Sequence, residues 1–450
     1  MTPPVGIAHA GWGAQTHQRA EGVDMPLLCT ALVVGDGETE VAIVDLDVGL
    51  LSPDYDLLVR NAIAAATGIP VSNIRVSYTH THSGPIEGFS WIAEGADLVE
   101  PWFKSLAPRA AEAVSMARAH MVEARVGTAS GSCDINVNRR PAGPNGRLFT
   151  GRNWDGFVDH EVLVTAVDDT DGRPIATLLN YACHPTIMGP DNRMITPDYP
   201  GPARQVVEQH VGGLCLFLQG AAGNQGPVDG FTGDLAVYRR LGTKLGLEAA
   251  RVRLSIDPVP RTEKLLQVLP SGADLGIYVD EQSGEPDASL AALMQDSPMP
   301  VKELPSQGEV EARFLATQAA LESVRRRKGS LAEVKTAAFP AKRAAIHMRL
   351  ARIFGRGGSK DIPVQVIRLG NTALVAIPVE PFAEIGVAVK KRSPADWTLF
   401  SGYSNGYYGY MPMRENYPEG GYEVDTTPFA PGAAEQMIES CVQAIEKLWR

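Results

Sequence analysis

Short apolar segments alternate with segments of helical periodicity along almost the whole chain of 450 residues. The apolar segments are predicted strands at residues 27–34, 40–46, 74–78, 162–168, 175–181, 214–219, 364–368 and 372–378. Helices are predicted at residues 53–67, 102–117, 201–209, 235–250, 310–327, 381–391 and 432–449. Strands that alternate with helices indicate an α/β fold, and nearly continuous apolar strands are typical of sheets covered on both faces. We therefore expect an α/β fold with mixed central sheets covered by helices.

The region from about residue 271 to residue 360 departs from this alternation. Its first part is rich in proline, serine, glutamate and lysine, and its second part has strong helical periodicity without an obvious strand. A long segment of this kind within a compact domain is typical of a lid or an interface element. We therefore expect one large domain over residues 1–450 with a helical insertion at about 271–360.

Two histidines separated by one residue follow the predicted strand at residues 74–78. The run Val-Ser-Tyr-Thr-His-Thr-His-Ser-Gly-Pro places His80 and His82 just before a Ser-Gly-Pro break. Side chains at i and i+2 of a strand face the same side, so both rings can point toward one site. Neutral imidazole is a good ligand for zinc, and an ordered strand end fixes its direction. The alternative is a pair of surface or hydrogen-bonded histidines.

A third histidine in a similar setting favours metal binding. The chain has only nine histidines, and His184 also follows an apolar predicted strand and precedes a proline. A mononuclear zinc hydrolase needs three protein ligands, so the third would be a carboxylate or another imidazole. Glu380 is the best candidate, because it lies directly at the end of a late apolar strand. Its alternative role is a helix-start carboxylate that interacts with the helix dipole.

Several segments in a fixed order resemble a known family. They are Gly6-Ile7-Ala8, Asp45-Leu46-Asp47, Thr79-His80-Thr81-His82-Ser83-Gly84-Pro85, Val137-Asn138-Arg139, Asn180-Tyr181-Ala182-Cys183-His184-Pro185-Thr186, Pro378-Val379-Glu380, the tyrosine-rich block 402–410 and Gly420-Gly421-Tyr422-Glu423. The chain resembles the N-terminal catalytic domain of the neutral, non-lysosomal ceramidases and their bacterial relatives. We expect that family's C-terminal immunoglobulin-like domain to be absent, because the chain ends shortly after its last predicted helix.

The resemblance implies a zinc site and a set of catalytic groups. It implies that Zn²⁺ is held by His80, His184, Glu380 and Tyr410. It further implies that three residues line the site and contact the substrate amide or the developing oxyanion, and these are His82, Arg139 and Tyr422. Zinc lowers the pKa of a bound water from about 15.7 towards 7, which activates it for attack on a carbonyl. We expect Arg139 and Tyr422 to stabilise the oxyanion and His82 to protonate the leaving amine.

Three further carboxylates are candidates for supporting roles. Asp198 matches a family aspartate that follows the second histidine, and we expect it to hydrogen-bond behind the ligands. Asp45 and Asp47, at an early strand end, are alternative supporting groups or ligands of a second metal.

One loop departs from the family pattern. The family places a serine in a Gly-Asp-x-Ser-Pro-Asn loop, and the corresponding residues here are Gly220-Ala221-Ala222-Gly223-Asn224. Gly223 stands where that serine would be, which excludes a serine-dependent mechanism at this position. We expect Gly223 and Asn224 to form a substrate loop in which glycine leaves room beside the metal. The departure indicates a substrate other than ceramide.

Composition excludes several classes of partner. The net charge of −11 argues against nucleic acid and against an anionic membrane surface as the main partner. No segment approaches 18 consecutive apolar residues, so no transmembrane segment is expected. The N-terminal residues lack the basic and apolar regions of a signal peptide, and we expect a cytoplasmic protein. A homo-oligomer is compatible with the sequence.

We therefore predict a zinc-dependent amidohydrolase that acts on a small-molecule or lipid-like N-acyl amide. Two alternatives remain at the level of sequence. One is an esterase or lactonase on the same scaffold, because metal-activated water attacks several carbonyl classes. The other is a catalytically silent, zinc-stabilised ligand-binding protein, which the absence of the serine would explain.

Overall fold

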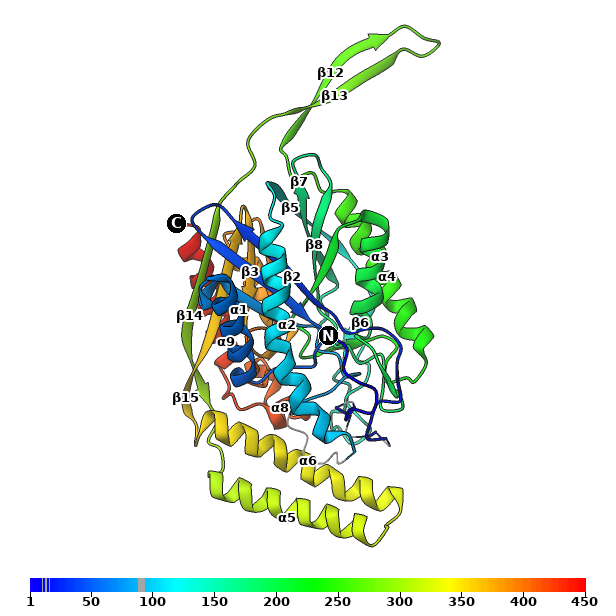
Figure 1. Cartoon of the computed structure of the whole chain (residues 1–450), viewed down its shortest axis with the longest axis vertical. Helices are drawn as coiled ribbons and strands as arrows, with labels where there is room; N and C mark the ends of the chain where they lie inside the picture. Colours follow the sequence, from blue (N-terminus) through cyan, green and yellow to red (C-terminus); the bar gives the residue numbers. More distant parts are fainter. Residues whose placement is uncertain (10, 13, 16, 88–93) are drawn as a thin grey trace.

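The structure is a computed structural model that describes residues 1–9, 11, 12, 14, 15, 17–87 and 94–450. Three sheets form its centre, and helices cover their outer faces (Figure 1). Apolar side chains from all three sheets share one buried cluster, which includes Ile43, Leu178, Leu216, Leu374 and Leu399. Because such a cluster removes apolar area from water on several strands at once, it joins the sheets into one domain. The predicted α/β fold with mixed sheets is confirmed.

The first sheet contains β2 (Cys29–Gly35), β3 (Glu40–Leu46) and β4 (Ile74–Tyr78). β2 runs antiparallel to β3, and β3 runs parallel to β4. The outer face packs against α1 (Pro53–Thr67) and α2 (Val99–Ala119). Local signals define α1, because Ser52 caps its first turn and Gly68 ends it in the left-handed conformation.

The second and third sheets are each four-stranded. The second has the order β10 (Leu214–Gln219), β8 (Pro174–Tyr181), β7 (Glu161–Asp169) and β5 (Ala124–Ser132), covered by α3 (Pro200–Val211) and α4 (Leu235–Leu254). The third has the order β14 (Leu290–Val301), β15 (Gly358–Leu369), β16 (Thr372–Ala376) and β18 (Trp397–Ser401), covered by α7 (Ala383–Arg392) and α9 (Ala433–Leu448). β10 is parallel to β8, and β16 is parallel to β18.

The carboxyl ends of strands from all three sheets meet at one edge. The Tyr78 N–H, at the end of β4, donates to Tyr403 O just after β18 at 2.9 Å. The Gly223 N–H, after β10, donates to Pro381 O, after β16, at 2.8 Å. Short pairings complete this edge, and they are β1 (Gly22–Val23) with β9 (Met194–Ile195), β6 (Asn136–Asn138) with β11 (Gln225–Pro227), and β17 (Glu380–Pro381) with β19 (Tyr410–Met411). The short helix α8 (Tyr422–Thr426) lies nearby.

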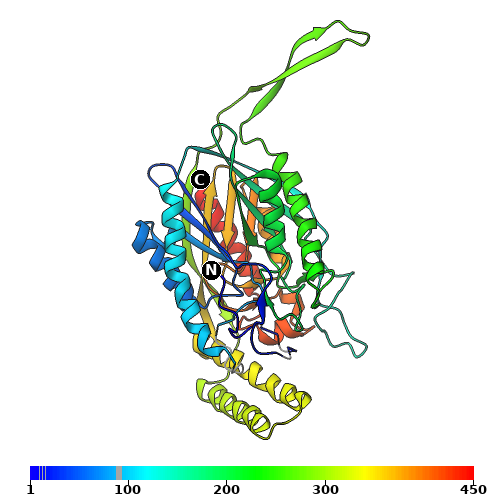
Figure 2. The same cartoon turned by 45° about the vertical axis from the view of Figure 1, so that its right-hand side comes forward.

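The predicted helical insertion at about 271–360 is helical only in its second half. The region begins inside an exposed hairpin of β12 (Arg261–Leu269) and β13 (Leu275–Gln282), continues through β14, and only then forms α5 (Gln307–Arg326) and α6 (Leu331–Phe354). Pro298 and Pro300 obscure β14 in the sequence, yet an edge strand tolerates prolines. The β12–β13 hairpin projects from one end of the molecule, and α5 and α6 lie at the opposite end (Figures 1 and 2).

Candidate metal centre

His80 is held in one orientation by its backbone and its ring. It follows β4 in the left-handed conformation, with a φ of 66°, and its N–H donates to Val48 O at 3.0 Å. The ring Nδ1 forms a short hydrogen bond with Gly49 O. A carbonyl oxygen only accepts, so Nδ1 donates a hydrogen and the ring turns its Nε2 toward the site.

His184 is oriented in the same way from the second sheet. Its ring Nδ1 donates to Ala222 O at 3.2 Å, which again leaves Nε2 as the free acceptor. Burial, and then the nearby positive charge of Arg139, lower the pKa of His184 well below its usual value, so the ring is neutral. The two Nε2 atoms of His80 and His184 lie 3.1 Å apart.

Glu380, in β17 just after β16 of the third sheet, lies against both rings. Its Oε2 is 3.5 Å from His80 Nε2 and 3.7 Å from His184 Nε2. The Tyr407 hydroxyl donates to Oε1 at 2.6 Å and the Tyr403 hydroxyl to Oε2 at 3.3 Å. Burial alone raises the pKa of this carboxyl, but His80, Arg139 and the hydrogen bond from Tyr407 outweigh it, so the pKa is lower than usual. Glu380 is therefore a carboxylate.

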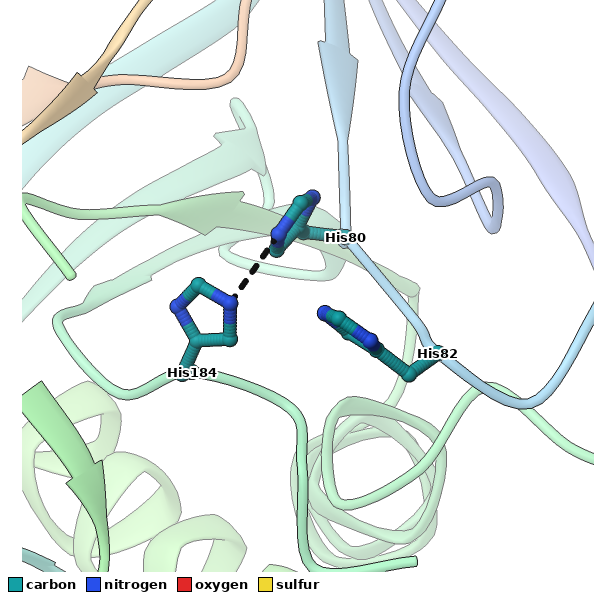
Figure 3. A group of neighbouring side chains, drawn as sticks. All are labelled: His80, His82 and His184. Carbon is teal, nitrogen blue, oxygen red and sulfur yellow. Dashed lines mark hydrogen bonds between the residues drawn. The ribbon is translucent and has the colours of Figure 1, made fainter. Parts of the chain in front are cut away.

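These atoms form a donor set that fits a metal cation. The Nε2 atoms of His80 and His184 and a carboxylate oxygen of Glu380 converge, with separations of 3.1 Å, 3.5 Å and 3.7 Å. His82 joins them, since its ligand atom and those of His80 and His184 all lie within 4.8 Å of one another (Figure 3). Both ring nitrogens of His82 are buried without a hydrogen-bond partner in the described part of the chain. The three histidines therefore lie close enough together to hold a metal ion.

Arg139 and Tyr410 lie together beside this group. Arg139 Nη2 donates to the Tyr410 hydroxyl at 3.0 Å, and its Nε donates to Glu423 at 3.0 Å. Glu423 also accepts from Arg140 at 2.8 Å. Burial disfavours the Arg139 charge, but Tyr410, Glu423 and Glu380 together raise its pKa, so it remains a cation. Burial raises the pKa of Tyr410 well above its usual value, so its phenol is neutral.

Tyr422 lies on α8 at the edge of the site. Its ring centre is 5.7 Å from that of Tyr410, and 45% of its surface is exposed, in contrast to the buried ligands. His82 packs against Trp12, with ring centres 5.0 Å apart. The structure thus brings all seven residues predicted for the centre and its catalytic groups into one region, whereas their roles stay predictions.

Asp198 and Asn224 hold loops rather than ligand rings. Asp198 Oδ2 accepts from Met188 N–H at 2.9 Å, which fixes the loop after His184. Asn224 Oδ1 accepts from Ala383 N–H at 2.8 Å, and its Nδ2 donates to Glu384 at 2.8 Å. Asn224 therefore ties the loop after β10 to the start of α7, close to Glu380.

The expectation that Gly223 leaves room beside the metal is wrong. A Cβ at this position would lie 2.6 Å from Glu380 O and 2.8 Å from Pro381 O. Glycine is required because two backbone segments approach each other here, and no side chain fits between them.

Asp45 and Asp47 share one buried arginine. Arg204 donates to Asp45 at 2.8 Å and to Asp47 at 2.6 Å, and all three side chains are buried. These contacts join the end of β3 to α3, while one oxygen of each carboxylate has no hydrogen-bond partner among the described residues. Their roles as supporting groups or second-metal ligands stay predictions. The sequence analysis overlooked Arg204 because it is an isolated arginine inside a helical segment.

Two further groups support the site without a clear signal in the sequence. Tyr407 lies in the tyrosine-rich block 402–410, where nothing in the sequence distinguishes it from Tyr408, yet its hydroxyl holds Glu380. Glu423 orients Arg139, and its only signal in the sequence was its place directly after Tyr422.

The centre opens into two cavities. The larger, of about 930 Å³, is lined by His82, His184, Arg139, Tyr410 and Tyr422, and also by residues of α5, α6 and the N-terminal loop. The smaller, of about 130 Å³, contains Glu380 and His80 and is bordered by apolar residues, namely Leu50, Ile86, Ile346, Leu350 and Ile353. No helix among the described residues is long and apolar enough to cross a membrane.

Curated proteins and solved structures resemble this chain over most of its length. The profile of the family described as neutral/alkaline non-lysosomal ceramidase, N-terminal, matches residues 2–231. The neutral ceramidase of Pseudomonas aeruginosa is 24% identical over 92% of this chain and 66% of its own length. The neutral ceramidase of Mycobacterium tuberculosis is 24% identical over 93% of this chain and 71% of its own length.

The same fold is found in a solved structure. The crystal structure of the Pseudomonas aeruginosa enzyme superposes with a TM-score of 0.69 at 18% identity, covering 100% of this chain and 72% of that one. A ceramidase complexed with C2 superposes with a TM-score of 0.67. With a family profile that matches half of its residues and a shared fold, this chain belongs to the neutral/alkaline non-lysosomal ceramidase family.

Proposed function

We propose that this protein is a zinc-dependent hydrolase that cleaves the carbon–nitrogen bond of an N-acyl amide. The observation that carries the proposal is the convergence of two imidazole Nε2 atoms, on His80 and His184, with the Glu380 carboxylate. Imidazole and carboxylate donors of this kind suit zinc. The named ceramidases among its relatives support an amide as the bond that is cleaved.

His80, His184 and Glu380 would hold the zinc, with Tyr410 as a weaker ligand. When bound, zinc supplies Lewis acidity and lowers the pKa of a water molecule towards neutrality. The carbonyls of Gly49 and Ala222 fix the tautomers of the two histidines, and Tyr407 orients the carboxylate. These contacts keep the donor atoms in place before any ligand binds.

The remaining groups act on the substrate. Arg139 stays charged and lines the cavity, so it can stabilise negative charge that develops on the carbonyl oxygen. Tyr422, at the same wall, can donate its hydroxyl to that oxygen. Burial lowers the pKa of His82 to about 3, so its ring is neutral, and both ring nitrogens lack a partner among the described residues. The ring can therefore accept a proton from the attacking water and pass it to the leaving amine.

The test combines metal analysis with turnover of matched amide and ester substrates. His80→Ala and His184→Ala should each lose both the bound zinc, about one per chain in the wild type, and the activity. His82→Ala should keep the zinc and lose activity by about 10²- to 10⁴-fold, the usual contribution of an acid catalyst. His120→Ala, at an exposed histidine after α2, is the control and should retain both.

The outcome that contradicts the proposal is full amide turnover by zinc-free His184→Ala protein. Turnover of the esters with no detectable hydrolysis of any matched amide would instead indicate an esterase.

A further inference from the structure

The larger cavity has a charge opposite to that of the protein. The chain as a whole carries 52 acidic and 41 basic residues. Yet the described residues that line this cavity include no aspartate or glutamate, and they include five cations, namely Arg139, Arg147, Arg313, Lys342 and Arg343. A cavity lined by one sign of charge concentrates ligands of the opposite sign.

Arg139 already donates hydrogen bonds to Tyr410 and Glu423. The other four cations lie on different elements and have other contacts. Arg313 lies on α5, Lys342 and Arg343 lie on α6, and Arg147 lies on the loop opposite them. Arg343 approaches Asp425 only at 3.6 Å, and both side chains are about half exposed, so the pair is weak. Among the described residues, no carboxylate pairs with the guanidinium groups of Arg147 or Arg313.

These cations share their cavity with the metal centre. Lys342 donates to Trp12 O at 3.0 Å, and the Trp12 ring packs on His82. Arg147 and Arg343 line the wall next to Tyr422. An anion bound there would therefore belong to a molecule whose other part reaches the metal centre, rather than to a surface outside the cavity.

The smaller cavity differs from the larger one in having few charged groups on its border. Its border is mainly apolar, and the one arginine in it, Arg349, lies over the Tyr407 ring at 5.1 Å. The two cavities share His82, Tyr410 and Tyr422. A bond placed at the metal would thus have an apolar group on one side and a cationic wall on the other.

We propose that the substrate is an acyl amide that carries an anionic group, a carboxylate or a phosphate, bound by Arg147, Arg313 and Arg343. Its apolar group occupies the smaller cavity. This inference rests on the proposed function and adds a substrate class to it.

The test compares three amides with the same acyl chain in the zinc-loaded enzyme. They are N-octanoylglycine, O-phospho-N-octanoylethanolamine and the neutral N-octanoylethanolamine. The better anionic amide should have a kcat/KM at least about tenfold above that of the neutral one at low salt, the usual size of a charge-assisted contact. Whether carboxylate or phosphate is preferred identifies the source of the charge. The preference should shrink in 0.5 M salt.

Variants locate the effect. Arg313→Gln and Arg147→Gln should each lower kcat/KM for the preferred anionic amide about tenfold, mainly through KM, and leave the neutral amide within about twofold. Arg326→Gln is the matched control, because Arg326 is an exposed arginine of α5 outside the cavity. This control substitution should leave kcat/KM unchanged for both the anionic and the neutral amide.

A binding measurement separates this inference from the proposed function. Calorimetry with zinc-free protein should show tighter binding of N-octanoylglycine than of N-octanoylethanolamine, and Arg313→Gln should remove the difference. Discrimination in binding without turnover would leave the anion site intact and contradict the hydrolase. Turnover of all three amides at equal rates, unchanged in both arginine variants, would overturn the anion site. A second outcome would also overturn the anion site, namely Arg313→Gln and Arg147→Gln variants that lose adsorption to phosphatidylglycerol vesicles but keep the wild-type kinetics. That result would make the arginines a membrane-contacting surface.

Discussion

At the scale of single residues, the metal centre depends on groups that never touch the metal. Two backbone carbonyls decide which nitrogen of each imidazole carries hydrogen, and two tyrosines hold the carboxylate. His80, His184 and Glu380 could be predicted because each follows an apolar strand. Tyr407 could not, because its partner lies 27 residues earlier and the two meet only after the loops fold.

Tyr407→Phe tests the support of the carboxylate. Loss of the 2.6 Å hydrogen bond should weaken zinc affinity or turnover about 10- to 100-fold, the usual effect of removing a group that orients a ligand. Zinc competition titrations and kcat measure the two effects. Tyr408→Phe is the control, because Tyr408 packs against Phe354 and its hydroxyl has no hydrogen-bond partner among the described residues. Equal results for the two variants would show that the contact with Glu380 is irrelevant.

Gly223→Ala tests the close approach of two backbone segments. The new Cβ would meet Glu380 O at 2.6 Å, so the segment that carries a ligand must move. We expect the free energy of unfolding to fall by about 1–3 kcal/mol, as for other overpacked sites, together with weaker zinc binding. Chemical denaturation and zinc titration measure this. Gly272→Ala, where nothing lies within 4 Å, should be neutral. A stable Gly223→Ala protein with normal zinc affinity would refute the steric argument.

At the scale of elements, uninterrupted runs of apolar residues predicted the buried strands correctly but did not reveal the exposed ones. The strands β3, β4, β8, β10 and β16 were predicted because water is excluded from both of their faces. The β12–β13 hairpin is exposed along its length, so no burial pattern marks it. β14 is an edge strand with two prolines, and its pairing partner β15 lies beyond two helices in the chain.

Deletion of residues 261–282 tests whether the β12–β13 hairpin contributes to the domain. The flanking residues are already joined, because Ser283 N–H donates to Pro260 O at 2.9 Å. A two-residue Gly-Ser link should therefore leave the melting temperature within about 2 °C, since little apolar area is lost from the core. Thermal unfolding and zinc content measure the result. A deletion that abolishes folding would show that the hairpin packs against part of this chain in solution.

At the scale of the whole molecule, the geometry of the candidate metal centre depends on how the three sheets pack against one another. His80, His184 and Glu380 each follow a strand of a different sheet, and the apolar cluster that the three sheets share sets their separation. The sequence predicted the ligands one by one, but not that three separate sheets carry them. That information lies in packing between segments hundreds of residues apart.

Zinc should therefore stabilise the folded state as a whole. A ligand that binds only the native protein adds about 2.7 kcal/mol at a concentration of 100 times Kd. Removal of zinc with a chelator should lower the melting temperature of the wild type and of His120→Ala equally. His184→Ala should already melt at the lower temperature and should not respond to the chelator. A melting temperature that chelation does not change in the wild type would contradict the linkage.

The spread of the ligands along the chain has a consequence for biosynthesis. A nascent chain that has just passed residue 231 already contains both histidine ligands, but it lacks the carboxylate at Glu380 and the phenol at Tyr410. The third sheet, which places those groups, is translated last. The complete set of proposed ligands therefore exists only after nearly the entire chain has been synthesised, and a ribosome-bound intermediate that contains only the histidines should hold the ion more weakly than the finished protein.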